Sequence, residues 1–320
     1  MGADGRALPR GVPAILVGID TTPLHQTRAG TARYLRGLLE HLDVPVRRLS
    51  FPATSRLRSA VADALWYPRL PAGDVDLLHC PSFRGPFAPR VPLVVTVHDL
   101  AVLREPAWFN RWTRAYSRLA VPRVVRAASR VIAVSEFTKR ELVDLLGVPE
   151  AKIRVVPNAV AEVFTPEGPK EEGDYVLAVG TLEPRKNLAR IAAAVDGELR
   201  VVGARGWGGV RAPRDVTWLG EVGDAELARL YRGARCLVYA SLYEGFGLPV
   251  AEALACGCAV VTSAGSAMAE VAGDDATYVD PHDVESIRAG IARAAPPAPR
   301  RVASWADVAR ATRAVYEELA

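Results

Sequence analysis

Two adjacent cations, Arg185 and Lys186, stand where a phosphate group would bind. They follow the apolar run Tyr175–Val179 and Gly180, and they precede a helical pattern that begins at Leu188. Ligands of parallel sheets bind beyond the carboxyl ends of the strands, and a helix N-terminus adds about half a positive charge with free N–H donors. Two solvated surface charges are the alternative. Cations normally avoid a helix N-terminus, however, and this exception favours a clamp for a diphosphate.

Two glutamates frame a glycine-rich segment, Glu244–Glu252, with the sequence Glu-Gly-Phe-Gly-Leu-Pro-Val-Ala-Glu. The segment follows the apolar run Cys236–Ala240. Its glycines allow close backbone approach, and its proline suits a first helical turn. We expect Glu244 on a ligand loop and Glu252 within the first turn of the next helix, where two carboxylates would accept hydrogen bonds from sugar or ribose hydroxyls. Glu252 alone could instead complement the helix dipole.

His98 and Asp99 end another apolar run, Leu93–Val97. This position faces the ligand side of a parallel sheet, and the neighbouring carboxylate could orient the imidazole toward a substrate. A structural histidine is the alternative. The dipeptide therefore marks a candidate catalytic histidine.

A loop from Asp20 to Gly30 follows the first apolar run of the chain. Gly30, Thr31 and Ala32 could present successive backbone N–H groups to a phosphate, as anion-binding turns do. The pattern therefore predicts that this loop lines a phosphate site.

Three patterns that look like ligand sites have structural explanations. Asp74-Val75-Asp76 spells the Asp-x-Asp of some metal-dependent enzymes, but it opens a predicted strand, and we interpret it as a turn. Gly203–Gly209 lacks the Gly-x-Gly-x-x-Gly spacing of a dinucleotide loop. Cys256 and Cys258 lie in an apolar stretch and are expected to be small buried hydrophobes. We therefore predict no metal site.

The elements that position these residues alternate between short apolar runs and helical patterns, which predicts parallel βαβ units. The runs are Ala14–Ile19, Val75–Cys80, Leu93–His98, Val131–Ser135 and Ile153–Val156, then Tyr175–Val179, Leu199–Gly203, Val216–Leu219, Cys236–Ala240 and Ala259–Thr262. A linker rich in Pro, Gly and charge, Pro166–Gly173, separates the two series. We expect one α/β domain over 1–165, a second over 166–302, and a helix within 303–320 that docks back on the first.

Composition agrees with two globular domains. The chain has 320 residues, of which 50% are hydrophobic and 24% charged, and this balance excludes disorder and collagen. Four cysteines are too few for a disulfide scaffold, and no stretch is apolar enough for a signal peptide or a membrane span. We therefore expect a cytoplasmic protein.

The net charge of +4 is unevenly distributed. Up to Thr165 there are 23 Lys and Arg against 14 Asp and Glu, and beyond it 17 against 22. Aromatic residues recur in the basic half at helical spacing beside arginines: Trp108, Trp112 and Tyr116, with Arg111, Arg114 and Arg118. Our hypothesis is that this helix meets an anionic lipid-linked acceptor or the inner face of a membrane. The alternative places the aromatics in the core and the arginines in water.

Taken together, these motifs resemble glycosyltransferase family 4, the retaining nucleotide-sugar transferases of GT-B fold. The likeness spans nearly the whole chain, and Arg-Lys upstream of Glu-x7-Glu in a Gly-Phe-Gly-Leu-Pro frame is a specific combination. The matching segments are Gly18–Asp20, Gly30–Tyr34, Val97–Leu100, Val134–Thr138, Val156–Val160, Gly180–Asn187, Leu219–Gly220 and Ser241–Glu252. The resemblance implies two Rossmann-like domains that face each other across a cleft.

The resemblance also implies roles for individual residues. Arg185 and Lys186 would bind the donor diphosphate. Glu252 would bind the ribose and Glu244 the donor sugar, and His98 would contact that sugar near its reacting carbon. The other implied donor contacts are Gly30, Gly180, Leu219, Gly220, Gly245, Phe246, Gly247 and Leu248, and the acceptor contacts are Asp99, Thr31 and Arg33.

Two further positions concern the edges of this site. The Gly203–Trp207 loop would lie near the base of the nucleotide. Ala32 stands where the family often has a second glycine, which affects phosphate or acceptor contact there.

Electrostatics fits a mechanism without a metal or cofactor. A leaving nucleoside diphosphate carries about three negative charges, which Arg185, Lys186 and helix N-termini would largely offset. Retention without an obvious nucleophile implies front-face attack, in which the departing phosphate takes the proton of the acceptor. Glu244 as a covalent nucleophile is the alternative.

The donor and the acceptor are predicted by likeness alone. The motifs His-Asp-Leu and Glu-Pro-Arg-Lys-Asn resemble those of family members that use GDP-mannose. Mannose is therefore the first choice for the transferred sugar, and another hexose or deoxyhexose is the second. A glycan, lipid-linked or small-molecule hydroxyl would accept it, in bacterial polysaccharide biosynthesis and without nucleic acid. The rival functions are a hydrolysing epimerase of the same fold and a nucleotide-sugar-binding subunit without turnover.

Overall fold

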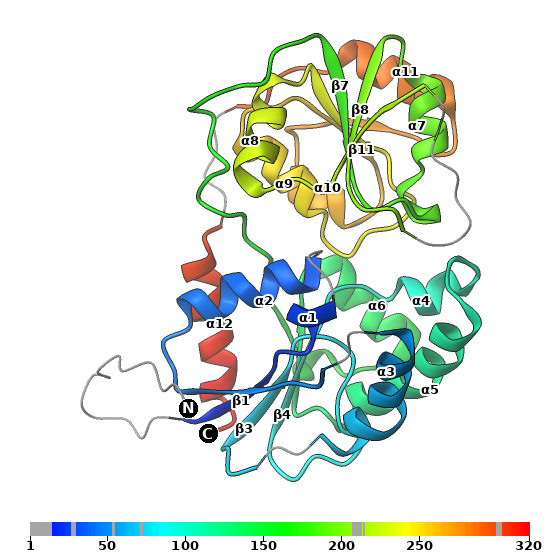
Figure 1. Ribbon diagram of the computed structural model, residues 1–320. Helices are drawn as coiled ribbons and strands as arrows, with labels where there is room; N and C mark the ends of the chain where they lie inside the picture. The colour runs from blue at the N-terminus through cyan, green and yellow to red at the C-terminus, as the bar shows by residue number, and fades with distance from the viewer. Residues whose placement is uncertain are drawn as a thin grey trace.

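The computed structural model describes residues 15–26, 30–52, 55–70, 73–206, 213, 215–298 and 303–320. Within these ranges the chain forms two six-stranded sheets, one from each half, in which the paired strands are parallel. Figure 1 shows one sheet above the other, each with helices against its faces. The α/β fold class is therefore as predicted.

The first sheet has the strand order β2-β1-β3-β4-β5-β6. Its strands are β1 (Val17–Asp20), β2 (Val46–Leu49), β3 (Leu77–Cys80), β4 (Leu93–Val97), β5 (Arg130–Ala133) and β6 (Ile153–Val155). The helices of this half are α1 (Pro23–Gln26), α2 (Gly30–His41), α3 (Arg56–Val61), α4 (Ala101–Arg104), α5 (Arg111–Ala127) and α6 (Glu136–Leu146). The inner strands β1, β3 and β4 are buried at every position, because helices cover both faces of the sheet.

The second sheet has the order β12-β11-β10-β7-β8-β9. Its strands are β7 (Tyr175–Val179), β8 (Glu198–Val202), β9 (Thr217–Gly220), β10 (Cys236–Tyr239), β11 (Val260–Ser263) and β12 (Thr277–Val279). Its helices are α7 (Leu188–Ala194), α8 (Asp224–Gly233), α9 (Leu248–Ala255), α10 (Ala267–Ala272) and α11 (Val284–Arg293). The chain passes from β6 of the first sheet to β7 of the second through residues 156–174.

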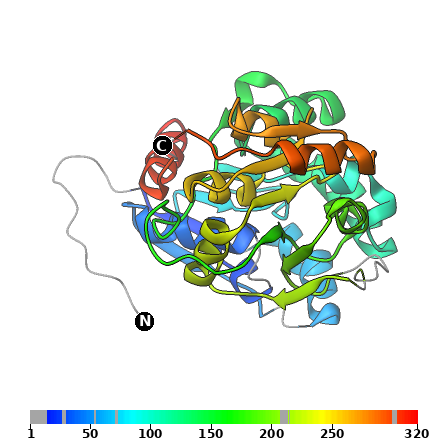
Figure 2. The same cartoon turned by 90° about the horizontal axis from the view of Figure 1, so that it is seen from above.

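The last helix, α12 (Trp305–Glu317), returns to the first half as predicted. The ring of Trp305 packs so closely on α2 that a Cβ added to Gly37 would lie 2.2 Å from it. The hydroxyl of Tyr316 lies 2.6 Å from Nδ1 of the buried His79 on β3. Seen from above in Figure 2, the second half covers the first, and α12 lies at one side. The chain end therefore stabilises the first sheet.

The aromatic helix differs from the prediction at its start. Trp108 lies in a separate turn, Pro106–Trp108, because the side chain of Asn110 caps the N-terminus of α5. Tyr116 is buried and Trp112 is exposed, so the two do not share one environment. Among the helices of the described ranges, none combines the length and the apolar character needed to cross a bilayer.

Candidate active site

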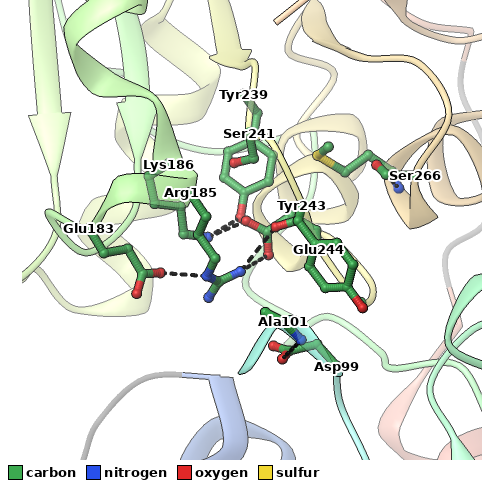
Figure 3. Close-up of polar contacts among 12 residues, drawn as sticks. Asp99, Ala101, Glu183, Arg185, Lys186, Tyr239, Ser241, Tyr243, Glu244 and Ser266 are labelled. Carbon is green, nitrogen blue, oxygen red and sulfur yellow. Dashed lines mark hydrogen bonds and ion pairs between the residues drawn. The ribbon is translucent and has the colours of Figure 1, made fainter. Parts of the chain in front are cut away.

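Arg185, Lys186 and Glu244 form one cluster at the carboxyl ends of β7 and β10 (Figure 3). Nη1 of Arg185 lies 2.6 Å from Oε2 of Glu244, and Nζ of Lys186 lies 2.6 Å from Oε1 of the same carboxylate. Lys186 also donates to the hydroxyl of Tyr239 at 2.5 Å. The two cations predicted for a diphosphate and the carboxylate predicted for a sugar are therefore adjacent.

The charges of this cluster are nearly balanced. Oε1 of Glu183 lies 2.8 Å from Nε of Arg185, so each cation already has a carboxylate partner. Burial alone would raise the pKa of Glu244, but the opposing effect of Arg185 and Lys186 is larger and brings the pKa down to about 2. This carboxylate is therefore ionised. Within the described residues, Nε and Nη1 of Arg185 hold its protein partners, and Nη2 has none and is left for a ligand. Glu183 stands two residues before Arg185 and was not among the predicted site residues.

A tight turn presents the two cations. They belong to the 3-10 turn Pro184–Lys186 and directly precede the helix α7, which begins at Leu188 as predicted. Asn187 between the two elements has a left-handed backbone with φ 58°, and its amide donates to Ala240 O at 3.0 Å. This amide ties the turn after β7 to the end of β10.

Glu252 lies deeper than expected. It is the fifth residue of α9 and therefore belongs to the second turn, because Gly247 caps the helix and Leu248 begins it. Its carboxylate is fully buried, and the hydroxyl of Tyr231 donates to Oε2 at 3.0 Å. Burial raises the pKa of Glu252 to about 7, against the opposing effects of Arg33 and Tyr231.

Arg33, predicted as an acceptor contact, pairs with residues of the second half. It extends from α2 to the second half, where its Nη1 lies 2.7 Å from Oε1 of Glu252 and its Nη2 lies 3.2 Å from Asp224. Its guanidinium also lies over the ring of Phe164. A cavity of about 300 Å³ between the halves is lined by Arg33, Glu252 and Leu248, among others. Arg33 therefore makes a contact between the halves, and its role toward the acceptor stays a prediction.

His98 is held by a backbone carbonyl. Its Nε2 donates to Pro81 O at 3.0 Å, and its ring packs edge-on against Tyr34. Asp99 does not supply the expected orienting hydrogen bond, because its Oδ1 accepts from the N–H of Ala101 at the start of α4. Burial lowers the pKa of His98, so the imidazole is neutral near pH 7. Figure 3 shows Asp99 on the side of the cluster that faces the first half.

The other predicted contacts lie around these groups. Gly30 is the first residue of α2 and is exposed, and Thr31 follows it, while residues 27–29 of the preceding loop lie outside the described ranges. Gly180 follows β7, and Gly220 closes β9, where its carbonyl accepts from the N–H of Gly203 at 2.8 Å. Leu219 is exposed beside it, whereas Trp207 lies outside the described ranges.

The discounted patterns have structural roles. Asp76 precedes β3, at the amino ends of the strands, whereas the site lies at carboxyl ends. Its Oδ2 accepts from the N–H of Leu16 at 2.8 Å. Cys256 and Cys258 are buried thiols, as predicted. Within the described part of the chain, no three His, Cys, Asp or Glu side chains are grouped as metal ligands.

Two family models match the chain. The model described as Glycosyltransferase Family 4 matches residues 18–164, and the one described as Glycosyl transferases group 1 matches residues 210–300. O-antigen chain mannosyltransferase B of Escherichia coli is 31% identical over 265 residues, covering 73% of this chain and 68% of that protein. O-antigen chain mannosyltransferase RfbU of Salmonella typhimurium is 30% identical over 217 residues, covering 62% and 59%.

Solved structures share the fold. The Anabaena HepE protein in complex with UDP and glucose aligns with a TM-score of 0.65 at 16% identity, over 95% of each chain. The two facing sheets and the site between them define a glycosyltransferase of GT-B fold. The chain belongs to glycosyltransferase family 4.

Proposed function

We propose that this glycosyltransferase transfers a hexose, mannose first, from a nucleoside-diphosphate sugar to a hydroxyl acceptor with retention of configuration. The cluster of Arg185, Lys186 and Glu244 supports the proposal, because two cations that can bind phosphate lie beside a carboxylate that can accept from hydroxyls. The two named mannosyltransferases support mannose, and a UDP complex of a structural neighbour supports a nucleotide-sugar donor.

The cluster can hold both ends of such a donor. Phosphate oxygens would accept hydrogen bonds from Nη2 of Arg185 and from Lys186, while the ionised Glu244 accepts from hydroxyls of the sugar. Glu183 and Glu244 keep the cations in place before the donor arrives, so little reorganisation is needed. We propose that these cations and the nearby helix N-termini stabilise the leaving diphosphate without a metal.

Retention then follows from front-face attack. The bond between the anomeric carbon and the phosphate oxygen breaks, and the acceptor oxygen bonds to the same face of that carbon. The acceptor proton passes to the departing phosphate oxygen. Glu244 is a poor covalent nucleophile here, because both of its oxygens are already engaged by Arg185 and Lys186.

We also propose a lipid-linked acceptor reached at the inner face of an anionic membrane. Among the described residues, four of the six exposed large apolar side chains lie on α3, on the turn Ala62–Trp66 and on α5: Val61, Leu65, Trp112 and Leu119. We call these four the apolar surface. The indole N–H of Trp112 on α5 donates to Asp63 in the segment Ala62–Trp66 at 3.4 Å and joins these two elements. Three exposed arginines lie on α5 beside Trp112 and Leu119 in the sequence: Arg111, Arg114 and Arg118. Exposed apolar side chains on a helix that also carries exposed arginines suit the boundary of an anionic bilayer.

The experiment is a donor screen. The protein is incubated with GDP-mannose, UDP-glucose and other nucleotide sugars, with and without polyprenyl-linked saccharide acceptors, and nucleotide release and product are measured. We expect acceptor-dependent release of GDP and an α-linked product by NMR from the α-linked donor. A β-linked product would refute retention, and an epimerised free sugar released without acceptor would indicate the epimerase.

A further inference from the structure

The start of α6, in the first half, forms hydrogen bonds with the loop that carries Glu244 and Gly245 in the second half. The hydroxyl of Ser135 donates to the carbonyl of Gly245 at 2.6 Å, and the hydroxyl of Thr138 donates to the same carbonyl at 3.0 Å. Both hydroxyls are buried, and Oγ of Ser135 also caps α6 by accepting from the N–H of Thr138. The carbonyl next along the chain from Glu244 is therefore held from across the cleft.

A carboxylate of the second half, Glu270, caps the N-terminus of α6. Oε1 of Glu270, on α10, accepts from the N–H of Glu136 at 2.8 Å, and Oε2 accepts from the N–H of Phe137 at 3.0 Å. These are first-turn N–H groups of α6, which have no partner inside their own helix. A carboxylate at a helix N-terminus is also stabilised by the helix dipole. The start of α6 is thus completed by a residue of the other half.

The same loop approaches the candidate catalytic histidine. A Cβ added to Gly245 would lie 1.7 Å from the carbonyl oxygen of His98 and 2.9 Å from Cβ of Asp99. Only a glycine permits this approach of the two backbones. Gly245 follows Glu244 directly, so a shift of this loop moves the carboxylate that holds Arg185 and Lys186.

We propose that Ser135, Thr138 and Glu270 are positioning residues, which together form a closure contact between the halves and set the place of Glu244. The contact forms only when the cleft is closed, because its donors and acceptors belong to opposite halves. When the cleft opens, water takes over these hydrogen bonds, and Glu244 and the start of α9 lose their fixed relation to His98. The inference rests on the proposed function in taking Glu244 as a donor-sugar residue.

A pair of variants at Thr138 tests the effect on turnover. Thr138→Val removes the hydroxyl at nearly constant shape, and Thr138→Ser keeps it. We expect Thr138→Val to lower kcat about three- to tenfold, the range for loss of one buried hydrogen bond, with the acceptor KM unchanged. We expect Thr138→Ser to stay within twofold of the wild type. A merely structural role would not separate the serine and valine variants in kcat alone.

A scattering measurement tests closure without turnover. Glu270→Ala removes the carboxylate of the closure contact, and Glu226→Ala removes an exposed glutamate from α8 of the same half. We expect small-angle X-ray scattering to give a larger radius of gyration for Glu270→Ala than for the wild type, and no change for Glu226→Ala. If Glu270→Ala leaves the radius unchanged, or Thr138→Val leaves kcat unchanged, the proposal is overturned. Because the radius needs no substrate, it remains decisive if the proposed function fails.

Discussion

Arg33 and Glu252 form an ion pair between the two halves of the molecule, with Nη1 and Oε1 2.7 Å apart. The approach is close, yet within the described residues Oε1 of Glu252 accepts no well-aligned hydrogen bond. That oxygen therefore keeps the capacity to accept from a ribose hydroxyl. Arg33 supplies the positive charge that opposes protonation of this buried carboxylate.

The charge of Glu252 should make donor binding depend on pH. Burial raises its pKa to about 7, so the carboxylate ionises as the pH rises through neutrality and only then accepts paired hydroxyl hydrogen bonds. We expect GDP to bind more tightly at pH 8 than at pH 6 in calorimetric titrations. Glu252→Gln should bind weakly and should keep only the pH dependence of GDP itself. Identical pH profiles for the two proteins would show that Glu252 is not the titrating group.

Gly245→Ala should separate the halves. The added Cβ would meet the carbonyl oxygen of His98 at 1.7 Å, and neither backbone can yield without moving the loop. We expect at least a hundredfold loss of transfer activity with circular dichroism unchanged. Gly223→Ala is the matched control, because no described heavy atom lies within 4 Å of its added Cβ. Full activity in Gly245→Ala would mean that turnover does not need this approach.

Gly37→Ala should loosen α12. The new methyl group would lie 2.2 Å from the ring of Trp305, and overpacking of this kind typically costs about 1–3 kcal/mol. Denaturant unfolding should therefore show a lower stability, although alanine favours a helix over glycine by about 1 kcal/mol. Gly30→Ala, in the same helix and with no described atom near its Cβ, should be neutral or slightly stabilising. Equal stability of both variants would argue against tight docking of α12.

The apolar surface should bind anionic vesicles. We expect the wild type to float with phosphatidylglycerol vesicles, less so at high salt, and the double variant Trp112→Ser with Leu119→Ser to lose most of this binding. Val163→Ser, which removes an exposed apolar side chain elsewhere, is the control. If the wild type binds no vesicles at any salt concentration, the proposed contact with an anionic membrane is wrong.

The sequence predicted the inner strands well and missed two at the edges. β2 and β12 end their sheets, and neither resembles a buried strand. β2 carries Arg47 and Arg48 at its centre with both side chains exposed, and β12 has only three residues. The other two edge strands, β6 and β9, were predicted from their apolar runs. In β2 and β12 few side chains are buried, so the apolar pattern is too weak to recognise.

The sequence predicted individual residues of the candidate site but not which side chains contact each other. Arg185, Lys186 and Glu244 were recognised because each follows a strand, and the structure brings them together. Partners such as Glu183 and the reach of Arg33 were not predicted. The pairing of Arg33 with Glu252 depends on how the two halves meet, and local spacing carries no information on that. Glu183 lies only two residues before Arg185, so its spacing was the available signal.

The central claim is that Arg185 holds the diphosphate of the donor, and a titration of GDP tests it most directly. Calorimetry should give a Kd for Arg185→Gln about 10- to 150-fold weaker than for the wild type, the range for a charged hydrogen bond of about 1.5–3 kcal/mol. Arg229→Gln, which changes an exposed arginine paired with Glu171, should bind as the wild type does. An Arg185→Gln variant that binds GDP with wild-type affinity would contradict the account.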